Sequence, residues 1–503
     1  MTSSRKDTPL TAAEMRTVFY GLMLGLFLSA VNQTIVATAL PTIGRQFADF
    51  ENLSWVIIAY LLSSTAVAPL YGKLSDIHGR RVVMLWALGL FIAGSVLSAI
   101  APDMATLIAG RTLQGLGGGG IVPLTQTTVA DMVAPRERGA YQAYLGVSWV
   151  TAGVAGPVLG GVIADYLHWS MIFWLNVPLG LLGALLVNRS MKRLPRYERP
   201  HKLDFVGAAL TAAAATLILL ALTSGGVRLS WLSPALIGMV AASLLLTLAL
   251  AWWTRRAPEP FLPLSVLGNP VVRMGTLAGS GALGAVIGLS IYLPLYFQVV
   301  HKLTATQAGL ALCPLIVLST PGSFISGRAM MHIRHYKISP YIGLSLAILM
   351  TALLVIWPAM SLSYALIVTA LLGFGVGTIY PVVTVSIQNA VANHQVGTAT
   401  GAMNFFRSLA SALVVAVMGA ILLAGLGATP ERGIGVELLV ATAGQAGLDV
   451  AGVFRFVFAA VLAFLALALL AVILMEERPL RGPAKNTEPP VVPEASVTRQ
   501  AAE

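Results

Sequence analysis

Long apolar stretches, separated by charge, proline or glycine, run through the whole chain and constrain its fold more than any other feature. Fourteen of them are long enough to cross the hydrocarbon core of a bilayer, which takes about 20 residues of α-helix. They cover 18–41, 54–74, 82–100, 105–129, 139–163, 170–188, 204–224, 233–253, 271–298, 306–327, 338–358, 362–387, 397–425 and 452–475. Only 10% of the residues are charged, against about 25% in an ordinary soluble domain. We therefore exclude a soluble enzyme and expect an all-α, multi-pass membrane protein.

The basic residues between the spans indicate the orientation. If the N-terminus is cytoplasmic, 24 Lys and Arg residues fall on cytoplasmic segments and 5 on outer ones. An excess of Lys and Arg on the cytoplasmic side is the usual rule for membrane proteins. We therefore expect both termini inside a bacterial-type inner (plasma) membrane. The net charge of +11 then reflects topology, and no nucleic-acid partner is expected.

An internal repeat divides the chain. The residues from Gly115 to Gly139 match those from Gly373 to Gly397 at a constant offset of 258, which predicts two six-span halves with an inserted pair of spans between them. The expected divisions are a cytoplasmic segment 1–17, an N-terminal bundle 18–203, the inserted pair 204–253, a C-terminal bundle 254–475 and a disordered cytoplasmic tail 476–503. Parallel halves are typical of transporters that bind substrate between them.

The most specific local pattern is Gly72-Lys73-Leu74-Ser75-Asp76-Ile77-His78-Gly79-Arg80-Arg81, in the expected loop between spans two and three. A basic loop that only sets topology would explain Arg80 and Arg81, but not Asp76 at its spacing. Asp76 can meet both a basic partner and the positive N-terminus of a facing helix, while Gly72 allows close helix approach. The pattern predicts a cytoplasmic latch, formed by Gly72, Asp76, Gly79, Arg80 and Arg81, that favours one of two conformations. It resembles the loop signature G-x-L-S-D-x-x-G-R-R of the major facilitator superfamily.

Span four carries Arg111, three residues before Gln114. A charge inside a membrane span is unfavourable and by default marks a substrate or ion pathway. The alternative is an arginine that extends to the outer interface, since Asp103 is only about two turns away. The segment also resembles the span-four motif of the superfamily, and the resemblance implies that Arg111 helps to govern proton exchange.

Span five is rich in glycine, with Gly153, Gly156, Gly160 and Gly161 around Pro157. Glycines at this density would by themselves mean only close helix packing. The string resembles the motif that typifies antiporters of the superfamily. The resemblance implies a bend at the interface between the halves.

Span one departs from the family pattern at one position. Residues 31–41 are similar to the first span of the fourteen-span drug:proton antiporter branch, which has Asp where this chain has Asn32. The resemblance extends from there to Arg407 in span thirteen. It implies the major facilitator fold, two six-helix bundles plus two central helices, in a multidrug efflux transporter.

Asn32 puts the usual route of proton coupling in doubt, because an amide does not titrate. None of the twenty acidic residues lies in the middle of a span. Asp131 and Asp165 come nearest. Either Asp131 or Asp165 binds the transported proton, or the substrate carries it, or transport is not coupled to protons.

The positions of the charged residues also indicate the kind of substrate. No carboxylate can be placed in a central cavity, whereas Arg111 and Arg407 can. Neutral, weakly anionic or lipid-like amphiphiles fit better than permanent cations. The candidate cavity residues are aromatic or amide-bearing and could equally be helix-packing residues: Gln33, Tyr60, Gln126, Tyr292, Tyr296, Tyr380, Gln388, Asn404 and Phe405.

Other function classes find no support in the sequence. The glycine run 117–120 lacks the Gly-Lys-Ser/Thr of a phosphate loop, and no H-E-x-x-H, cysteine pair or G-x-S-x-G motif occurs. We expect neither an enzyme nor an ATP-driven pump, and neither a metal nor a bound cofactor. The expected protein is a monomeric exporter of hydrophobic or amphiphilic drug-like compounds, driven by the proton gradient as an antiporter. The alternative is an uncoupled or lipid-type exporter of the same fold. Its partners would be the lipid bilayer, a small hydrophobic substrate and, if the route extends further, a periplasmic adaptor and an outer-membrane channel.

Overall fold

Helices provide the regular structure throughout the described residues. The computed structural model describes residues 12–49, 52–193, 204–226, 229–426 and 449–480, which contain no strand beyond one isolated bridge. Thirteen helical stretches among them are long and apolar enough to cross a membrane. A further helix, α4 (Met104–Met132), packs along α2 and α3 and contains the glycine run and Arg111, which lower its hydropathy. The expectation of an all-α, multi-pass membrane protein is confirmed.

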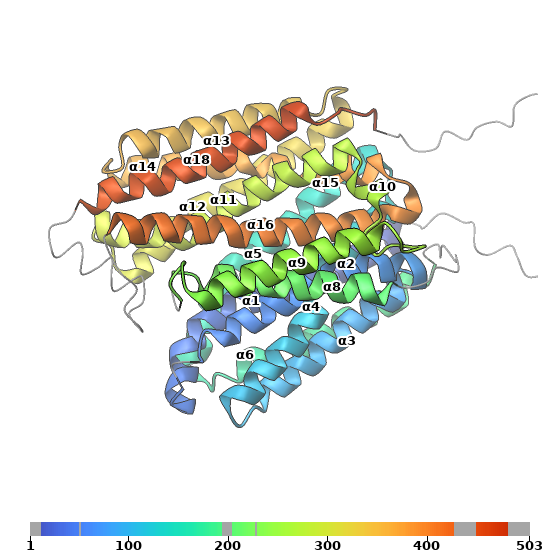
Figure 1. Ribbon diagram of the computed structural model, residues 1–503, viewed down its shortest axis with the longest axis horizontal. Coiled ribbons are helices and arrows are strands. Elements are labelled where there is room, and N and C mark those ends of the chain that lie inside the picture. The colour runs from blue at the N-terminus through green and yellow to red at the C-terminus, as the bar shows by residue number, and fades with distance from the viewer. Residues whose placement is uncertain (1–11, 50–51, 194–203, 227–228, 427–448, 481–503) are drawn as a thin grey trace, which may run out of the picture.

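The helices form two bundles with a pair between them (Figure 1). The first bundle consists of α1 (Ala12–Phe47), α2 (Trp55–His78), α3 (Arg80–Ala99), α4, α5 (Pro135–Tyr166), α6 (Met171–Trp174) and α7 (Asn176–Ser190). The pair is α8 (Phe205–Ser224) and α9 (Pro234–Thr254). The second bundle consists of α10 (Leu264–Leu267), α11 (Pro270–Val300), α12 (Ala305–His332), α13 (Ile338–Ile356), α14 (Leu362–Gly377), α15 (Ile379–Ala390), α16 (Val396–Gly425) and α18 (Val450–Leu474).

Glycine pairs join the two bundles along two seams, one between α2 and α16 and one between α5 and α12. In the first seam a Cβ on Gly72 would collide with the carbonyl oxygen of Gly397. In the second, a Cβ on Gly327 would collide with the carbonyl oxygen of Gly139. Gly139 and Gly397 are the two repeat-related glycines at the offset of 258. The repeat therefore supplies one glycine to each seam, and the helices approach as closely as only glycine allows.

Both seams lie at the same end of the molecule, which we call the latch end because it holds Asp76. α2 ends there at His78, α12 ends there at His332, and α16 begins there at Val396. In Figure 1 this is the right-hand end, near α10, where the molecule is narrower than at the opposite end. The described arrangement is thus closed at the latch end.

The inserted pair is attached to the first seam. α8 contacts both α2 and α16. The Asp204 carboxylate accepts hydrogen bonds from the N–H of Gly207 at 2.8 Å, from Trp253 Nε1 at 2.8 Å and from the N–H of Phe261 at 3.0 Å. It thereby caps α8 and ties it to the end of α9 and to the following segment. Phe261 packs in one apolar cluster with Ala402 of α16.

The C-terminal segment begins differently from the expectation of disorder after residue 475. Residues 476–480 run in an ordered path across the latch end of the second bundle. Lys337 Nζ donates to the carbonyl oxygen of Met475 at 2.6 Å, Tyr336 Oη donates to that of Arg478 at 3.0 Å, and Leu480 packs on an apolar cluster. These contacts satisfy the last carbonyls of α18 and cover Leu480, which explains the order. Residues 481–503, the rest of the expected tail, lie outside the described part, as do residues 1–11.

The glycines of span five face two directions. Cβ atoms on Gly156 and Gly160 would collide with Thr34 and Thr38 of α1, in the same bundle, whereas Gly153 faces Ile316 of α12. The interface role implied by the antiporter resemblance is therefore corrected for Gly156 and Gly160, which pack α5 on α1. Gly161 has open space around it. The backbone of Pro157 is helical, and its side chain lies outside the described part.

This packing predicts different consequences for two neighbouring glycines. Gly156→Ala would place a methyl group against Thr34, whose hydroxyl is held by a hydrogen bond to Ala152. We expect a loss of about 1–3 kcal/mol of stability from overpacking, measured as a lower midpoint of thermal unfolding in detergent micelles. Gly161→Ala is the matched control and should leave the midpoint almost unchanged. Equal midpoints for the two variants would contradict the assigned packing of α5 on α1.

Candidate functional site

The latch residues lie on helices rather than in a loop, which corrects the sequence expectation. α2 continues through Asp76 to His78, and α3 begins at Arg80. Only Gly79 separates the two helices, with φ 84° in the region that favours glycine. The helical path brings Asp76 and Arg80 four residues apart onto one face of the turn, so the two side chains can pair.

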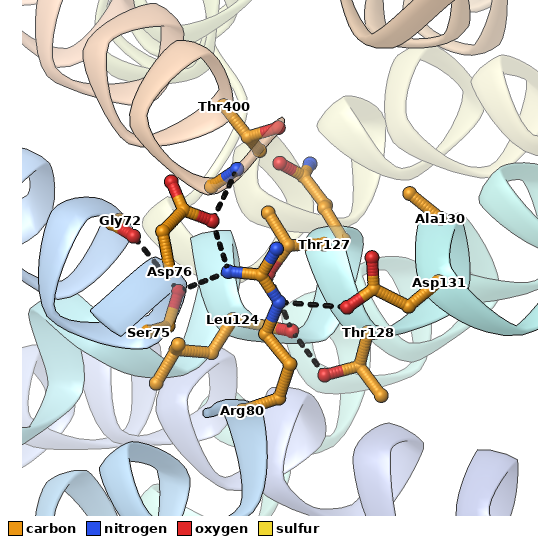
Figure 2. Close-up of polar contacts among 12 residues, drawn as sticks. Gly72, Ser75, Asp76, Arg80, Leu124, Thr127, Thr128, Ala130, Asp131 and Thr400 are labelled. Carbon is orange, nitrogen blue, oxygen red and sulfur yellow. Dashed lines mark hydrogen bonds and ion pairs between the residues drawn. The ribbon is translucent and has the colours of Figure 1, made fainter. Parts of the chain in front are cut away.

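Arg80 is shared by two carboxylates. Its Nη1 donates to Asp76 at 2.7 Å and its Nε donates to Asp131 of α4 at 2.8 Å. Figure 2 shows the guanidinium between the two acids, with a further contact to Ser75. All three charged side chains are almost fully buried. A buried arginine is stable only when its charge is matched by bonded partners, so the three residues act as one unit.

Asp76 also joins the first bundle to the second. Its carboxylate accepts from the N–H of Gly397 at 3.2 Å, the N–H of Thr398 at 2.8 Å and the Thr398 hydroxyl at 2.9 Å. These groups stand at the N-terminus of α16, where free N–H groups and the helix dipole favour a negative charge. A Cβ at Gly397 would collide with Asp76. The contact therefore depends on the glycine as well as on the acid.

Arg81 points elsewhere: its guanidinium donates to the side chain of Asn188 in α7. It links α3 to α7 within the first bundle and does not reach the second. The latch across the seam consists of Gly72, Asp76 and Arg80 on one side and Gly397 and Thr398 on the other.

A second polar cluster surrounds Arg111, which is only 1% exposed. Its Nε donates to the carbonyl oxygen of Val56 at 2.8 Å, and its Nη1 donates to Asn32 Oδ1 at 3.2 Å and to Gln114. Tyr60 and Phe173 cover the guanidinium with their rings, at 4.5 and 5.8 Å from the ring centres. Arg111 thus lies inside the first bundle, and its alternative placement at an interface is excluded by this burial.

Asn32 lies at the centre of that cluster, where its single side-chain oxygen accepts hydrogen bonds from three donors. Its Oδ1 accepts from Arg111, from Gln114 Nε2 at 3.1 Å and from Asn176 Nδ2 at 3.4 Å. Its own Nδ2 is buried and has no partner within the described part of the chain. Every described neighbour offers a donor, so the surroundings suit a carboxylate better than an amide.

Amides at the seam form a further contact between the bundles. Asn404 Nδ2 donates to Gln126 Oε1 at 2.7 Å, and Gln388 Nε2 donates to the carbonyl oxygen of Gln126 at 3.3 Å. Three expected cavity residues therefore bridge the two halves in this conformation. Gln33 is exposed on α1, and Phe405 is buried beside Phe406.

Three expected cavity tyrosines lie in bundle interiors instead. Tyr296 is fully buried against Phe454 and Phe458 and donates to the carbonyl oxygen of Pro358 at 2.7 Å. Tyr292 donates to the carbonyl oxygen of Val415 at 3.1 Å. Tyr60 covers Arg111, with its hydroxyl 3.3 Å from that of Ser29. Their hydroxyl groups are satisfied within one bundle, so these residues are corrected to packing roles.

The remaining expected residues are Arg407, Tyr380 and Asp165. Arg407 lies over the Tyr380 ring, 5.4 Å from its centre. Asp165 is in the helical part of α5, and its side chain lies outside the described part. Within the described residues, no group of three or more His, Cys, Asp or Glu side chains could hold a metal ion.

Sequence reasoning did not identify Asn176, Ser95 or Thr398. Ser95 accepts from Gln114 at 2.7 Å, and Asn176 contacts Asn32. Both are polar residues inside largely apolar spans, which is a usable signal. Thr398 follows the repeat-related Gly397, but the repeat alone does not indicate that Thr398 donates to Asp76.

Comparison with known proteins identifies the family. The model of the Major Facilitator Superfamily matches residues 22–415. The chain belongs to the major facilitator superfamily. It is 30% identical over 416 residues to Multidrug resistance protein 3 of Bacillus subtilis, covering 82% of this chain and 81% of that one. It is 31% identical over 428 residues to the MFS-type efflux pump LUC4 of Fusarium sp, covering 83% and 75%.

Solved structures agree on the fold. The human organic anion transporter MFSD10 superposes with a TM-score of 0.63 at 19% identity, covering 93% of this chain and 100% of that one. This major facilitator protein is thus a membrane transporter with multidrug-efflux relatives, in a family of transporters rather than enzymes.

The surroundings of Asn32 predict that a carboxylate there stabilises the protein. Asn32→Asp would give Arg111 a counter-ion and remove the unpaired Nδ2. Because Arg111 is already buried, we expect the free energy of unfolding to rise by about 1 kcal/mol or more. The measurement is the midpoint of thermal unfolding, which should be higher. Asn176→Asp is the matched control: it replaces a donor to Asn32 Oδ1 with an acceptor and should lower the midpoint. If Asn32→Asp destabilises as much as Asn176→Asp, the cluster is not arranged to hold a carboxylate.

Proposed function

We propose that this transporter exports hydrophobic or amphiphilic drug-like compounds from the cytoplasm by alternating access. The observation that carries the proposal is the latch, a polar contact that joins the halves at the latch end and can open without unfolding either bundle. The multidrug-efflux relatives support the substrate class. The proposed partners are the lipid bilayer and the substrate, with the protein acting as a monomer.

The latch end is proposed to be the cytoplasmic end. Lys73, Arg81 and Arg136 lie at this end, together with Arg334 and Lys337. Basic residues concentrate on the cytoplasmic side of membrane proteins. In this assignment both termini are cytoplasmic, the membrane is a plasma (inner) membrane, and the described conformation is closed toward the cytoplasm.

Alternating access then requires that the first seam opens. Opening separates Asp76 from the N-terminus of α16 and withdraws Gly72 from Gly397, while Arg80 keeps both of its carboxylates because Asp76, Arg80 and Asp131 all belong to the first bundle. The charges stay paired during the movement. This makes the latch reversible, since no buried charge is left without a partner.

Proton antiport is proposed to use Asp131 rather than the first span. Asn32 does not titrate, and the described cluster around Arg111 contains no carboxylate. Asp131 shares Arg80 with Asp76, so protonation of Asp131 would leave Arg80 to Asp76 alone and weaken the hold of Asp76 on α16. An uncoupled exporter is the second candidate, and Asn32 is the observation that favours it.

The experiment is proton flux in liposomes that contain the purified chain and a pH-sensitive dye, challenged with a panel of hydrophobic compounds. We expect compounds to drive proton movement in the unaltered chain and Asp131→Asn to abolish it, because the amide cannot carry the proton. Asp103→Asn is the matched control: Asp103 caps α4 at the opposite end and should leave the flux unchanged.

Two results would change the proposal. Compound efflux without proton movement in the unaltered chain would establish the uncoupled exporter. No efflux of any compound in the panel would contradict export itself.

A further inference from the structure

Arg407 differs from the other buried arginines that the structure describes. It is 7% exposed, its Nε has no hydrogen-bond partner, and its guanidinium donates to no described residue. By contrast, Arg80 is bound by two carboxylates, Arg111 by side-chain and backbone oxygens, and Arg138 by the carbonyl oxygens of Val133 and Ala130. Arg407 is therefore a buried cation whose described partner is an aromatic ring.

An unmatched cation in a membrane bundle is unfavourable. Removing a guanidinium from water loses its hydration, and only bonded partners or a counter-charge restore that free energy. The ring of Tyr380, 5.4 Å from the guanidinium carbon, supplies part of the compensation through its π face. It leaves the N–H donors unused. A group that brings acceptors and negative charge would complete the site.

The position of Arg407 suits a substrate. It lies on α16 one turn beyond Asn404, which bonds Gln126 across the seam between the bundles. Gly279 of α11 faces it, and a Cβ there would come into van der Waals contact with Nε at 3.7 Å, so the glycine leaves a methyl-sized gap beside the donor. Arg407 thus stands next to the layer of amides that closes the latch end.

We propose that Arg407 and Tyr380 bind the anionic head group of an amphiphilic substrate, a carboxylate, sulfonate or phosphate ester attached to an apolar body. Arginine binds such oxyanions through two parallel N–H bonds. Arg111 is less suited to this role, because its Nε and Nη1 donate to Val56, Asn32 and Gln114 and the rings of Tyr60 and Phe173 cover its guanidinium. The inference rests on the proposed export function and names its substrate class.

Binding of two matched probes tests the proposal. 1-Pyrenebutyrate and 1-pyrenebutanol share the same apolar body and differ in charge, and energy transfer from the tryptophans to pyrene reports binding to the full chain in detergent micelles. We expect the unaltered chain to bind the butyrate about tenfold or more tightly, the gain typical of a charge-assisted pair. Arg407→Gln should remove this preference and leave butanol binding unchanged, while Arg407→Lys should keep part of it. Arg455→Gln, at an exposed arginine of α18, should change neither.

Unchanged butanol binding also shows that Arg407→Gln is folded. Equal binding of the two probes by the unaltered chain, or equal weakening of both by Arg407→Gln, would overturn the assignment while leaving the export function intact. Failure of the unaltered chain to bind butanol at all would instead contradict the export function.

The same anionic chemistry occurs in bilayer lipids, and a further arm separates the two sources. The butyrate measurement is repeated in vesicles of phosphatidylcholine with and without phosphatidylglycerol. Competition by phosphatidylglycerol that disappears in Arg407→Gln identifies a lipid head group as an occupant, and lack of competition identifies a soluble amphiphile. Competition that persists in Arg407→Gln would overturn the site.

Discussion

One arginine held by two carboxylates organises the closed end of this transporter. Arg80 fixes Asp76 and Asp131 in the first bundle, and this arrangement aims Asp76 at the free N–H groups of α16 in the second. Removing one partner of a buried pair typically costs about 3–5 kcal/mol, so the three side chains hold together within the first bundle. The glycines at 72 and 397 bring the helices close enough for the contact. The seam, the closed conformation and the attachment of α8 all depend on this approach.

The two halves use their buried arginines differently. In the first half, Arg111 is surrounded by amides, a carbonyl and two rings, and its cluster lacks only the carboxylate that Asn32 would be as Asp. In the second half, the guanidinium of Arg407 contacts the Tyr380 ring and has no hydrogen-bond acceptor among the described residues. Duplication gave both halves the same helical frame and a glycine in each seam, whereas the polar residues differ between them. The second half therefore has the arginine for which we propose a substrate charge as partner.

Much of the fold could be predicted from the sequence, because spans of about 20 apolar residues are set by bilayer thickness. The partners of Asp76 also followed from chemistry, since a buried acid needs a cation or a helix N-terminus. Other features could not be predicted. Tyr296 and Gly156 lie on helices that are apolar all round, so spacing alone does not say which face meets the core, the seam or α1. The sequence did not show that the latch motif stays helical up to Gly79. The donors around Asn32 come from α4 and α7, which only tertiary packing brings to α1.

Opening of this latch during alternating access can be followed by distances between spin labels. In a Cys313→Ser background, one pair of labels at His78 and His332 reports the latch end, and a second pair at Ile100 and Ser361 reports the opposite end; all four positions are exposed. On addition of a transported compound, we expect a second population in which the latch-end distance is longer and the opposite distance is shorter. Two distances that stay unchanged, or that lengthen together, would contradict alternating access.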